Sequence, residues 1–268
     1  MEPSPSRLQA SALTLAYDQK TIAHDLSVAI PDRQFTVIIG PNACGKSTLL
    51  RALCRLLKPR NGQVLLDGQD IHQMGTKVLA RQLGLLPQHA IVPEGISVAD
   101  LVARGRYPHQ SLLKQWSEAD RQAVDAAMQA TNVSELAARS VDELSGGQRQ
   151  RVWVAMVLAQ QTPLLLLDEP TTWLDIAHQI ELLDLFCQLN QEHGHTLVAV
   201  LHDLNQACRY ADHLIVMKQG AIIAQGKPAE IISAPLVQQV FGMSSVIIND
   251  PVSHTPMIVP CGRYHQPG

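Results

Sequence analysis

Two kinds of hydrophobic pattern alternate along this chain. Residues 8–15 and 21–30 predict two short strands joined by a turn, and Tyr17 closes the first strand. Residues 35–39 are β-branched or aromatic and residues 164–167 are four leucines, as is typical of parallel strands buried on both faces. Apolar residues recur at helical spacing between such strands. The pattern therefore predicts an α/β fold.

The remaining elements of the α/β part follow from the same analysis. A first helix is predicted directly after residue 47, ending near Leu57. Further strands are predicted at 63–67, 83–88 and 196–201, further helices at about 176–192 and 204–210, and a hairpin-like pair at 213–217 and 221–225. The tail after about Met243 carries prolines and little periodicity.

Residues 90–160 differ in character from the rest. Ser97-Val98-Ala99-Asp100 and Ser117-Glu118-Ala119-Asp120 both fit the capping pattern that begins a helix. Helical spacing follows each, so this region is predicted to be a helical insertion. We therefore expect one domain over residues 1–268, with a core at about 8–89 and 161–242, a helical subdomain at about 90–160 and a tail at 243–268.

Composition restricts the function classes. The chain has 268 residues, of which 46% are hydrophobic and 17% charged, as in globular proteins. A formal net charge of −3 gives no electrostatic case for nucleic acid as a partner. No run approaches the ~20 apolar residues of a membrane helix, and the N-terminus lacks a signal-peptide core. We therefore expect a cytoplasmic protein for which another chain supplies any membrane span.

Five cysteines are widely spaced, without a C-x-x-C pair, and indicate neither a disulfide framework nor a zinc site. They are Cys44, Cys54, Cys187, Cys208 and Cys261.

A phosphate-binding pattern, G-x-x-x-x-G-K-[ST], follows the strand at 35–39 and begins the first helix. Small residues allow backbone N–H groups to surround an anion, and the helix N-terminus adds positive potential. Lys46 is placed to reach the β- and γ-phosphates, and the Ser47 hydroxyl to bind Mg²⁺. The simpler interpretation is a glycine-rich turn. The run is Gly40, Pro41, Asn42, Ala43, Cys44, Gly45, Lys46, Ser47 and Thr48.

Cys44 within this loop has two interpretations. It is either a small residue that fills the loop, or a redox-sensitive thiol whose pKa is lowered by the helix N-terminus.

Two acidic residues follow the leucine strand. Ligands bind at the carboxyl ends of strands in open α/β sheets, so Asp168 is placed to hold Mg²⁺ and Glu169 to deprotonate an attacking water. The alternative is a pair of carboxylates that cap the next helix.

Two further strands end in polar residues that should face the same crevice. Gln88 is expected to contact Mg²⁺ and the attacking water, and His202 the γ-phosphate. A lone histidine after a strand is more often structural, so His202 carries weight only together with the other residues.

A second anion-binding pattern lies before a helix. Ser145, Gly146, Gly147 and Gln148 combine a serine N-cap with two glycines and a helix N-terminus. Because the chain already contains one phosphate loop, a second such site suggests a nucleotide held between two copies of the chain. An ordinary Ser-Gly-Gly turn is the alternative.

Taken in order, these motifs resemble the ATP-binding cassette ATPases over about residues 8 to 242. The resemblance implies a P-loop NTPase (RecA-like) core, an N-terminal antiparallel β subdomain and an inserted α-helical subdomain. It also implies ATP and Mg²⁺ as cofactors, a head-to-tail dimer, adenine stacking on Tyr17, and a nucleotide-binding place for Asp175. The preference for ATP over GTP is implied by the resemblance to this family alone. The matching residues are Gly40–Thr48, Gln88, Leu144–Gln148, Asp168–Glu169, Leu174–Asp175 and His202.

A narrower resemblance concerns the cargo. The run Gly105-Arg106-Tyr107-Pro108-His109, together with residues 168–176, resembles ATPase subunits of bacterial importers for iron chelates, haem and cobalamin. Residues 250–256 favour ferric siderophores. Such importers imply two membrane permeases as partners and, indirectly, a periplasmic binding protein. Residues 88–108 would then form the permease dock at the cytoplasmic face of the cell membrane; the simpler interpretation is a surface loop with a Tyr-Pro turn.

One residue departs from the family pattern, which usually has glycine where Ala43 stands. If this position needs a positive φ, alanine costs on the order of 1 kcal/mol.

The sequence thus predicts the ATP-hydrolysing subunit of a ferric siderophore importer, with haem or cobalamin import as the alternative. Rival classes are an exporter ATPase, a non-hydrolysing scaffold, and a soluble cassette ATPase of DNA repair or translation. The last would need a nucleic-acid- or ribosome-binding insertion or a second cassette, and this sequence has neither.

Overall fold

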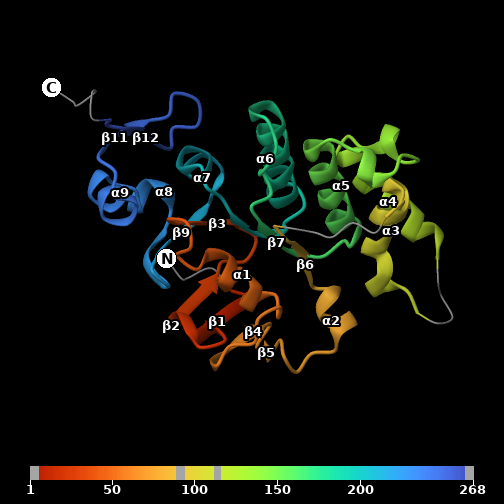
Figure 1. Ribbon diagram of the computed structural model, residues 1–268, viewed down its shortest axis with the longest axis horizontal. Helices are drawn as coiled ribbons and strands as arrows, with labels where there is room; N and C mark the ends of the chain where they lie inside the picture. Colours follow the sequence, from red (N-terminus) through yellow and green to blue (C-terminus); the bar gives the residue numbers. More distant parts are fainter. Residues whose placement is uncertain (1–5, 89–93, 112–115, 263–268) are drawn as a thin grey trace. The chain divides into compact units, whose positions relative to one another are not determined.

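The computed structural model describes residues 6–88, 94–111 and 116–262. It comprises two compact units, and Figure 1 labels the helices and strands of both. The first unit comprises Met1–Gln73 with Val198–Gly268, and the second comprises Met74–Leu197.

The first unit contains a four-stranded antiparallel sheet in the order β2-β1-β4-β5. Its strands are β1 (Leu8–Tyr17), β2 (Lys20–Ile30), β4 (Asn61–Leu66) and β5 (Gln69–Asp70). Strands β1 and β2 pair from Leu8 opposite Ile30 to Tyr17 opposite Lys20. The predicted strands are confirmed, and the expected antiparallel β subdomain is present.

Three more strands of this unit form the support of the phosphate loop. They are β3 (Phe35–Ile39), β9 (His213–Lys218) and β10 (Ala221–Gly226). Strand β3 runs parallel to β9, and β9 pairs antiparallel with β10, which confirms the predicted hairpin. All five residues of β3 are buried, as its continuous apolar pattern predicts.

The described residues of the first unit form four α-helices: α1 (Lys46–Leu53), α7 (Leu204–Tyr210), α8 (Pro228–Ile231) and α9 (Ala234–Phe241). The prediction that α1 continues to about Leu57 is wrong. Arg55 adopts a left-handed backbone conformation with φ 65°, which helical residues do not tolerate. The N–H groups of Leu56 and Leu57 both donate to the carbonyl of Arg51, so the helix end is closed by backbone bonds.

The tail, whose pattern predicts little structure, contains a hairpin. Strands β11 (Ser245–Asn249) and β12 (Pro256–Pro260) pair antiparallel from Ser245 opposite Pro260 to Asn249 opposite Pro256. The two prolines stand at the ends of β12, where a strand tolerates them best. Because each strand has only five residues, its alternation is too short to predict it.

In the second unit, β6 (Leu83–Leu86) and β7 (Leu164–Asp168) form a parallel pair in which Leu86 lies opposite Leu167. Strand β8 (Thr196–Val200) crosses the division between the units and is buried along its whole length. Helices α2 (Thr76–Ala80) and α6 (Ile176–Gln191) also belong to this unit. The expected strand at 83–88 is shorter than predicted, so Gln88 lies two residues beyond its end.

The helical part has its own core, built by α3 (Val98–Ala103), α4 (Glu118–Ala130) and α5 (Gly146–Ala159). A 3₁₀ helix, η1 (Arg104–His109), follows α3 directly, and two shorter ones, η2 (Ser134–Leu136) and η3 (Val141–Glu143), precede α5. Both predicted caps are confirmed, because Ser97 accepts from the N–H of Asp100 and Ser117 forms a capping box with Asp120. Within the described ranges, every helix is too short or too polar to span a bilayer.

A buried ion pair joins η1 to α4. Arg106 Nε donates to Asp120 Oδ1 at 2.8 Å, and both side chains are almost completely buried. The same guanidinium donates to the Ala159 carbonyl at 2.7 Å and to the Gln161 side chain at 2.9 Å. Hydrogen bonds from Ser117 and Arg106 lower the pKa of Asp120, so its carboxylate stays charged.

We expect Asp120→Asn to destabilise the protein by about 3–5 kcal/mol, because Arg106 then keeps a buried charge without its counter-ion. The check is urea unfolding followed by circular dichroism. Since the folded-state pKa of Asp120 is lowered, its contribution is present above about pH 4 and is lost as the pH falls below that value. The difference between wild type and variant should shrink accordingly.

The matched control is Glu118→Gln, whose partner Arg121 lies 3.9 Å away and is equally exposed. It should change the free energy of unfolding by less than about 0.5 kcal/mol. Equal effects from both substitutions would contradict the assigned role of the buried pair.

Candidate nucleotide-binding site

The N-terminus of α1 is open to an anion. Its N-cap is Gly45, which provides no side-chain acceptor, and the first helical bond runs from the Leu49 N–H to the Gly45 carbonyl. The other described helices of eight or more residues have side-chain caps, namely Ser117, Ser145, Asp175 and Ser233. The N-terminus of α1 therefore has no side-chain cap, which suits a helix end that receives a phosphate.

The turn between β9 and β10 supports the phosphate loop. The Gly220 N–H donates to the Cys44 carbonyl at 2.9 Å. A Cβ atom at Gly40 would lie 2.2 Å from the Met217 carbonyl oxygen, and one at Gly220 would lie 1.9 Å from that of Ile22. Backbone thus packs directly on backbone, and only glycine fits these two positions.

Lys46 is the charged residue of the loop and is 5% exposed. Its Nζ donates to the carbonyl oxygens of Gly40 at 2.9 Å and Pro41 at 3.0 Å. The ammonium group therefore lies against the loop itself. Ser47, the next residue, is half-buried in the first turn of α1.

Cys44 is buried within the loop, and this burial raises the pKa of its thiol. A raised pKa disfavours the reactive thiolate at neutral pH. The interpretation as a redox-sensitive thiol, which required a lowered pKa, is therefore wrong, and Cys44 is a small residue that fills the loop.

Ala43 adopts φ 59°, so the condition for strain at this position is met. A non-glycine residue in the left-handed region costs on the order of 1 kcal/mol. Asn42 and Ala43 are both exposed.

Tyr17 and His202 complete the candidate residues of the first unit. Tyr17 lies at the end of β1, is 40% exposed, and its hydroxyl is 3.4 Å from Arg51 of α1. The ring is therefore beside the helix that the phosphate loop begins. His202 is exposed and lies between β8 and the N-cap of α7, Asp203.

The acidic candidates lie at the end of β7 in the second unit. Asp168 is the last residue of the strand and is buried. Glu169 has φ 54°, and its Oε2 accepts from the Thr172 hydroxyl at 3.4 Å. Since β6 and β7 are parallel, Gln88 comes from the same edge of this strand pair.

Ser145 and Gln148 form a capping box at the start of α5. The Gln148 N–H donates to Ser145 Oγ at 3.2 Å, and the Ser145 N–H donates to Gln148 Oε1 at 3.1 Å. A Cβ at Gly147 would lie 3.3 Å from Leu174, and one at Gly146 would lie 3.6 Å from Trp173. The segment Ser145–Gln148 therefore lies against the turn that precedes α6.

Asp175 is the N-cap of α6. Its Oδ1 accepts from the His178 N–H at 3.0 Å and contacts His178 Nδ1 at 2.8 Å. These hydrogen bonds lower the pKa of Asp175.

Sequence reasoning did not single out Trp173 or Ile176 as site residues. Both flank Asp175 and are strongly exposed, Trp173 at 75% and Ile176 at 77%, and Trp173 has φ 69°. The sequence does contain a signal for them, because two large apolar residues stand in a short turn and the hydrophobic pattern of the core does not account for them. Of the two, Trp173 lies beside Gly146 of the segment Ser145–Gln148.

A separate pocket of about 580 Å³ lies among α4, α5 and α6. Half of the residues that line it are alanine or leucine, and His193 and His195 are also among them. The residues that line it do not include the candidate nucleotide residues, so volume alone does not identify the site.

The model of one protein family, described as ABC transporter, matches residues 23–172. This chain belongs to the ABC transporter family. The ferric enterobactin transport ATP-binding protein FepC of Escherichia coli (strain K12) is 58% identical over 98% of this chain and 97% of its own length. The probable siderophore transport system ATP-binding protein YusV of Bacillus subtilis (strain 168) is 52% identical, over 96% and 94%.

A solved structure supports the same assignment. An inward-facing ABC transporter, described as of the metal-chelate type, matches 97% of this chain and 98% of its own with a TM-score of 0.82 and 27% identity. The chain is thus an ATP-binding ATPase subunit of the ABC type, with a P-loop NTPase core. Subunits of this type dimerise and work with membrane permeases.

We expect Ala43→Gly to stabilise this ABC subunit by up to about 1 kcal/mol, because glycine adopts φ 59° without a Cβ clash. The gain is opposed in part by the greater freedom of glycine in the unfolded chain. Urea unfolding and ATP titration of both proteins measure the effect. Ala52→Gly, inside α1, is the control and should destabilise by about 1 kcal/mol. A destabilised Ala43→Gly would contradict strain in the loop.

Proposed function

We propose that this subunit hydrolyses ATP to drive the import of a ferric siderophore across the cytoplasmic membrane. The observation that carries the cargo class is the 58% identity to FepC, which extends over nearly the whole of both chains. The run Gly105–His109, which resembles that of importers for iron chelates, haem and cobalamin, is consistent with this class.

Several residues act on the nucleotide in this proposal. The open N-terminus of α1 and Lys46 hold the β- and γ-phosphates and stabilise the charge that develops during transfer. Tyr17 stacks on the adenine ring. Glu169 accepts the proton of the attacking water, and His202 contacts the γ-phosphate.

The donor set proposed for Mg²⁺ is chemically suitable, because Ser47, Gln88 and Asp168 offer hydroxyl, amide and carboxylate oxygens, which hard cations prefer. When bound, Mg²⁺ neutralises charge on the phosphate oxygens. Asp168 is buried at the end of β7, so its carboxylate is held in place by the strand.

A second copy of the subunit covers Ser145–Gln148 in this proposal. The segment carries a helix N-terminus suited to the γ-phosphate held by the phosphate loop of the other copy. Trp173 and Ile176 support the proposal, since exposed apolar side chains beside this segment gain from burial in a dimer. Asp175 then lies within the nucleotide sandwich.

The permease dock is proposed at η1, within the expected range 88–108, of which residues 89–93 lie outside the described residues. Tyr107 is 65% exposed, and Lys77 Nζ lies 4.6 Å from the centre of its ring. Arg81 Nε donates to the Pro108 carbonyl at 2.8 Å, so the backbone beneath the exposed ring is fixed. A rigid aromatic residue on such a base suits a protein interface.

Helix α5 connects the proposed dock to the segment Ser145–Gln148. A Cβ at Gly105 would lie 2.1 Å from the Met156 carbonyl oxygen, so η1 packs directly on α5. His109 Nε2 is 2.8 Å from the Gln160 carbonyl, at the C-terminal end of the helix. Ser145 caps the other end, 14 helical residues or roughly 21 Å away. A displacement of the dock is thereby transmitted to Ser145 as a rigid-body movement.

We expect Glu169→Gln to bind ATP and dimerise but to lose at least about 100-fold in ATP hydrolysis, because the amide cannot accept the proton of the attacking water. Phosphate release and size-exclusion chromatography with ATP measure these properties. The control is Glu181→Gln on α6, an exposed glutamate, which should hydrolyse ATP like wild type. Normal phosphate release from Glu169→Gln would remove Glu169 from the role of base.

Uptake by cells tests the cargo. In cells whose only copy carries Glu169→Gln, we expect loss of radio-iron uptake on at least one ferric siderophore and normal uptake of labelled haem and cobalamin. Selective loss of haem or cobalamin would retain the importer and change the cargo. Unchanged uptake of all cargoes would favour an exporter or a non-transport cassette.

A further inference from the structure

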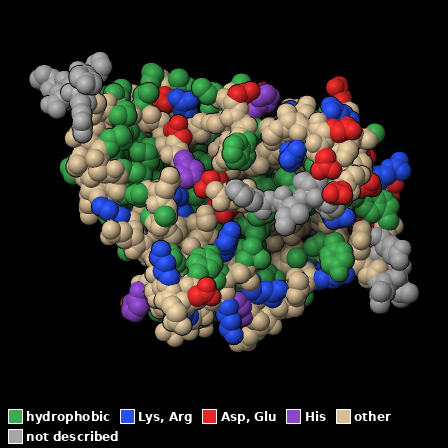
Figure 2. All heavy atoms as spheres, viewed as in Figure 1, with side chains coloured by type: hydrophobic (Ala, Val, Ile, Leu, Met, Phe, Trp, Pro, Cys, Tyr) green, Lys and Arg blue, Asp and Glu red, His purple; other side chains and the backbone are tan. Residues whose placement is uncertain are grey.

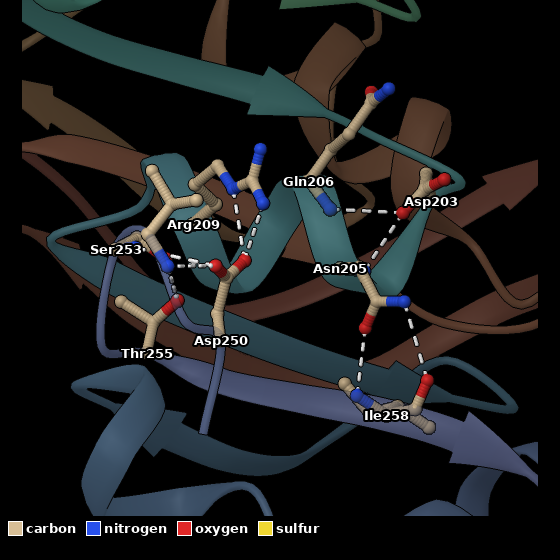
Figure 3. A network of polar contacts seen from close by, with 9 residues as sticks. Asp203, Asn205, Gln206, Arg209, Asp250, Ser253, Thr255 and Ile258 are labelled. Carbon is tan, nitrogen blue, oxygen red and sulfur yellow. Dashed lines mark hydrogen bonds and ion pairs between the residues drawn. The ribbon is translucent and has the colours of Figure 1, made fainter. Parts of the chain in front are cut away.

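The C-terminal hairpin is bonded to α7, the helix that follows His202 (Figure 3). The side-chain amide of Asn205, on α7, bonds the backbone of Ile258, on β12, through both its nitrogen and its oxygen. Its Nδ2 donates to the Ile258 carbonyl at 3.2 Å, and its Oδ1 accepts from the Ile258 N–H at 2.8 Å. The side chain thus bonds β12 as a neighbouring strand would, with both groups paired.

Asp250 provides the second attachment. It is 3% exposed, and its Oδ2 accepts two hydrogen bonds from Arg209, on the last turn of α7, one of them from Nε at 3.1 Å. Its Oδ1 accepts from the N–H groups of Val252 at 2.8 Å and Ser253 at 3.3 Å, which shapes the turn between the strands. The Arg209 guanidinium lowers the pKa of Asp250 to about 2, so the ion pair is present at neutral pH.

Helix α7 is short and begins two residues after His202. Asp203 caps it by accepting from the N–H groups of Asn205 at 2.8 Å and Gln206 at 2.9 Å. The residue before His202, Leu201, is bonded through its N–H to the Ile38 carbonyl of β3. Only two turns of helix separate this junction from Arg209, so attachments at Asn205 and Arg209 fix the direction in which the helix leaves His202.

The hairpin is otherwise poorly buried. Val246, Ile248 and Val259 are exposed on it, and Val252 in its turn is the most exposed of the four. A single two-stranded hairpin is marginally stable in water, so these strands depend on the packing of β12 on α7 and of β11 on α9. The hydrogen bonds of Asn205 and Asp250 therefore fix how the hairpin lies on α7, and each of the two elements stabilises the position of the other.

We propose that the C-terminal hairpin is a positioning element of the ATPase site, in which Asp250 and Asn205 hold α7 so that His202 is directed at the γ-phosphate. The inference rests on the proposed role of His202. Neither Asp250 nor Asn205 touches the nucleotide. They act through the helix, and their loss should reduce turnover while leaving nucleotide affinity intact.

Asp250→Asn is the most informative variant. The amide keeps an oxygen for the N–H groups of Val252 and Ser253, but presents an NH₂ group to Arg209 in place of a charged oxygen. We expect kcat for ATP to fall about tenfold with KM changed less than about twofold. Asp250→Glu, which keeps the charge, should restore at least half of the lost kcat. Ser253→Ala removes a hydroxyl from the same turn and should match wild type.

The decisive measurement places Asp250→Asn in a His202→Ala background, where the residual rate is followed with radiolabelled ATP. If Asp250 acts through His202, the second substitution adds no further loss. An equal tenfold fall in both backgrounds would overturn the proposal in favour of a general structural role. Asn205→Ala repeats the test from the other attachment should Asp250→Asn fail to fold.

The outcomes separate this inference from the proposed function. Wild-type kcat in His202→Ala would remove His202 from the reaction and the inference with it. A large loss in His202→Ala with wild-type kcat in both Asp250→Asn and Asn205→Ala would leave the proposed role of His202 standing and overturn the positioning role alone. If the hairpin instead stabilises a dimer, these variants would raise KM and weaken ATP-dependent dimerisation, which also overturns it.

Discussion

The phosphate loop depends on close contact between backbone segments. Its first glycine lies against the Met217 carbonyl, and the turn that supports the loop lies against Ile22, with no room for a Cβ at either place. These contacts fix the loop at the N-terminus of α1, which has no side-chain cap, and the Lys46 ammonium donates to the loop carbonyl of Gly40. The proposed roles of Tyr17 and His202 depend on this position of the loop, because both residues are proposed to contact a nucleotide whose phosphates the loop binds.

Much of the fold could be predicted because the signals are local. Ser97, Ser117 and Ser145 each cap the helix that their spacing indicates, and the buried strands are continuous apolar runs. The predictions from sequence fail where a contact between residues far apart in the chain, or the backbone angle of a single residue, determines the structure. Helix α1 stops early, before the left-handed Arg55. Strands β11 and β12 are supported by α9 and α7, and the contact between β12 and α7 joins residues about 50 positions apart in the chain.

The candidate site was predictable to the extent that phosphate chemistry requires fixed residue types at fixed spacing. Gly40–Thr48 and Ser145–Gln148 are such motifs. Burial and conformation were not predictable, and so the thiol of Cys44 was open to two interpretations until its burial was known. The exposure of Trp173 could not be predicted from the motif either.

Figure 2 shows one face of the molecule, on which charged and hydrophobic side chains are interspersed and no single sign of charge dominates, in agreement with the small net charge.

The arrangement of η1 has a consequence for divergence within the family. Arg106 donates to three acceptors, Asp120 on α4 and Ala159 and Gln161 at the end of α5, from two nitrogens of its planar guanidinium, which the single nitrogen of lysine does not reproduce. The neighbouring Tyr107, by contrast, is largely exposed and contacts Lys77 on one side. Natural variation should therefore accumulate at position 107 while position 106 resists it. At the proposed permease dock, the outer surface of η1 is therefore free to change with its membrane partner while the contacts between η1 and α5 stay the same.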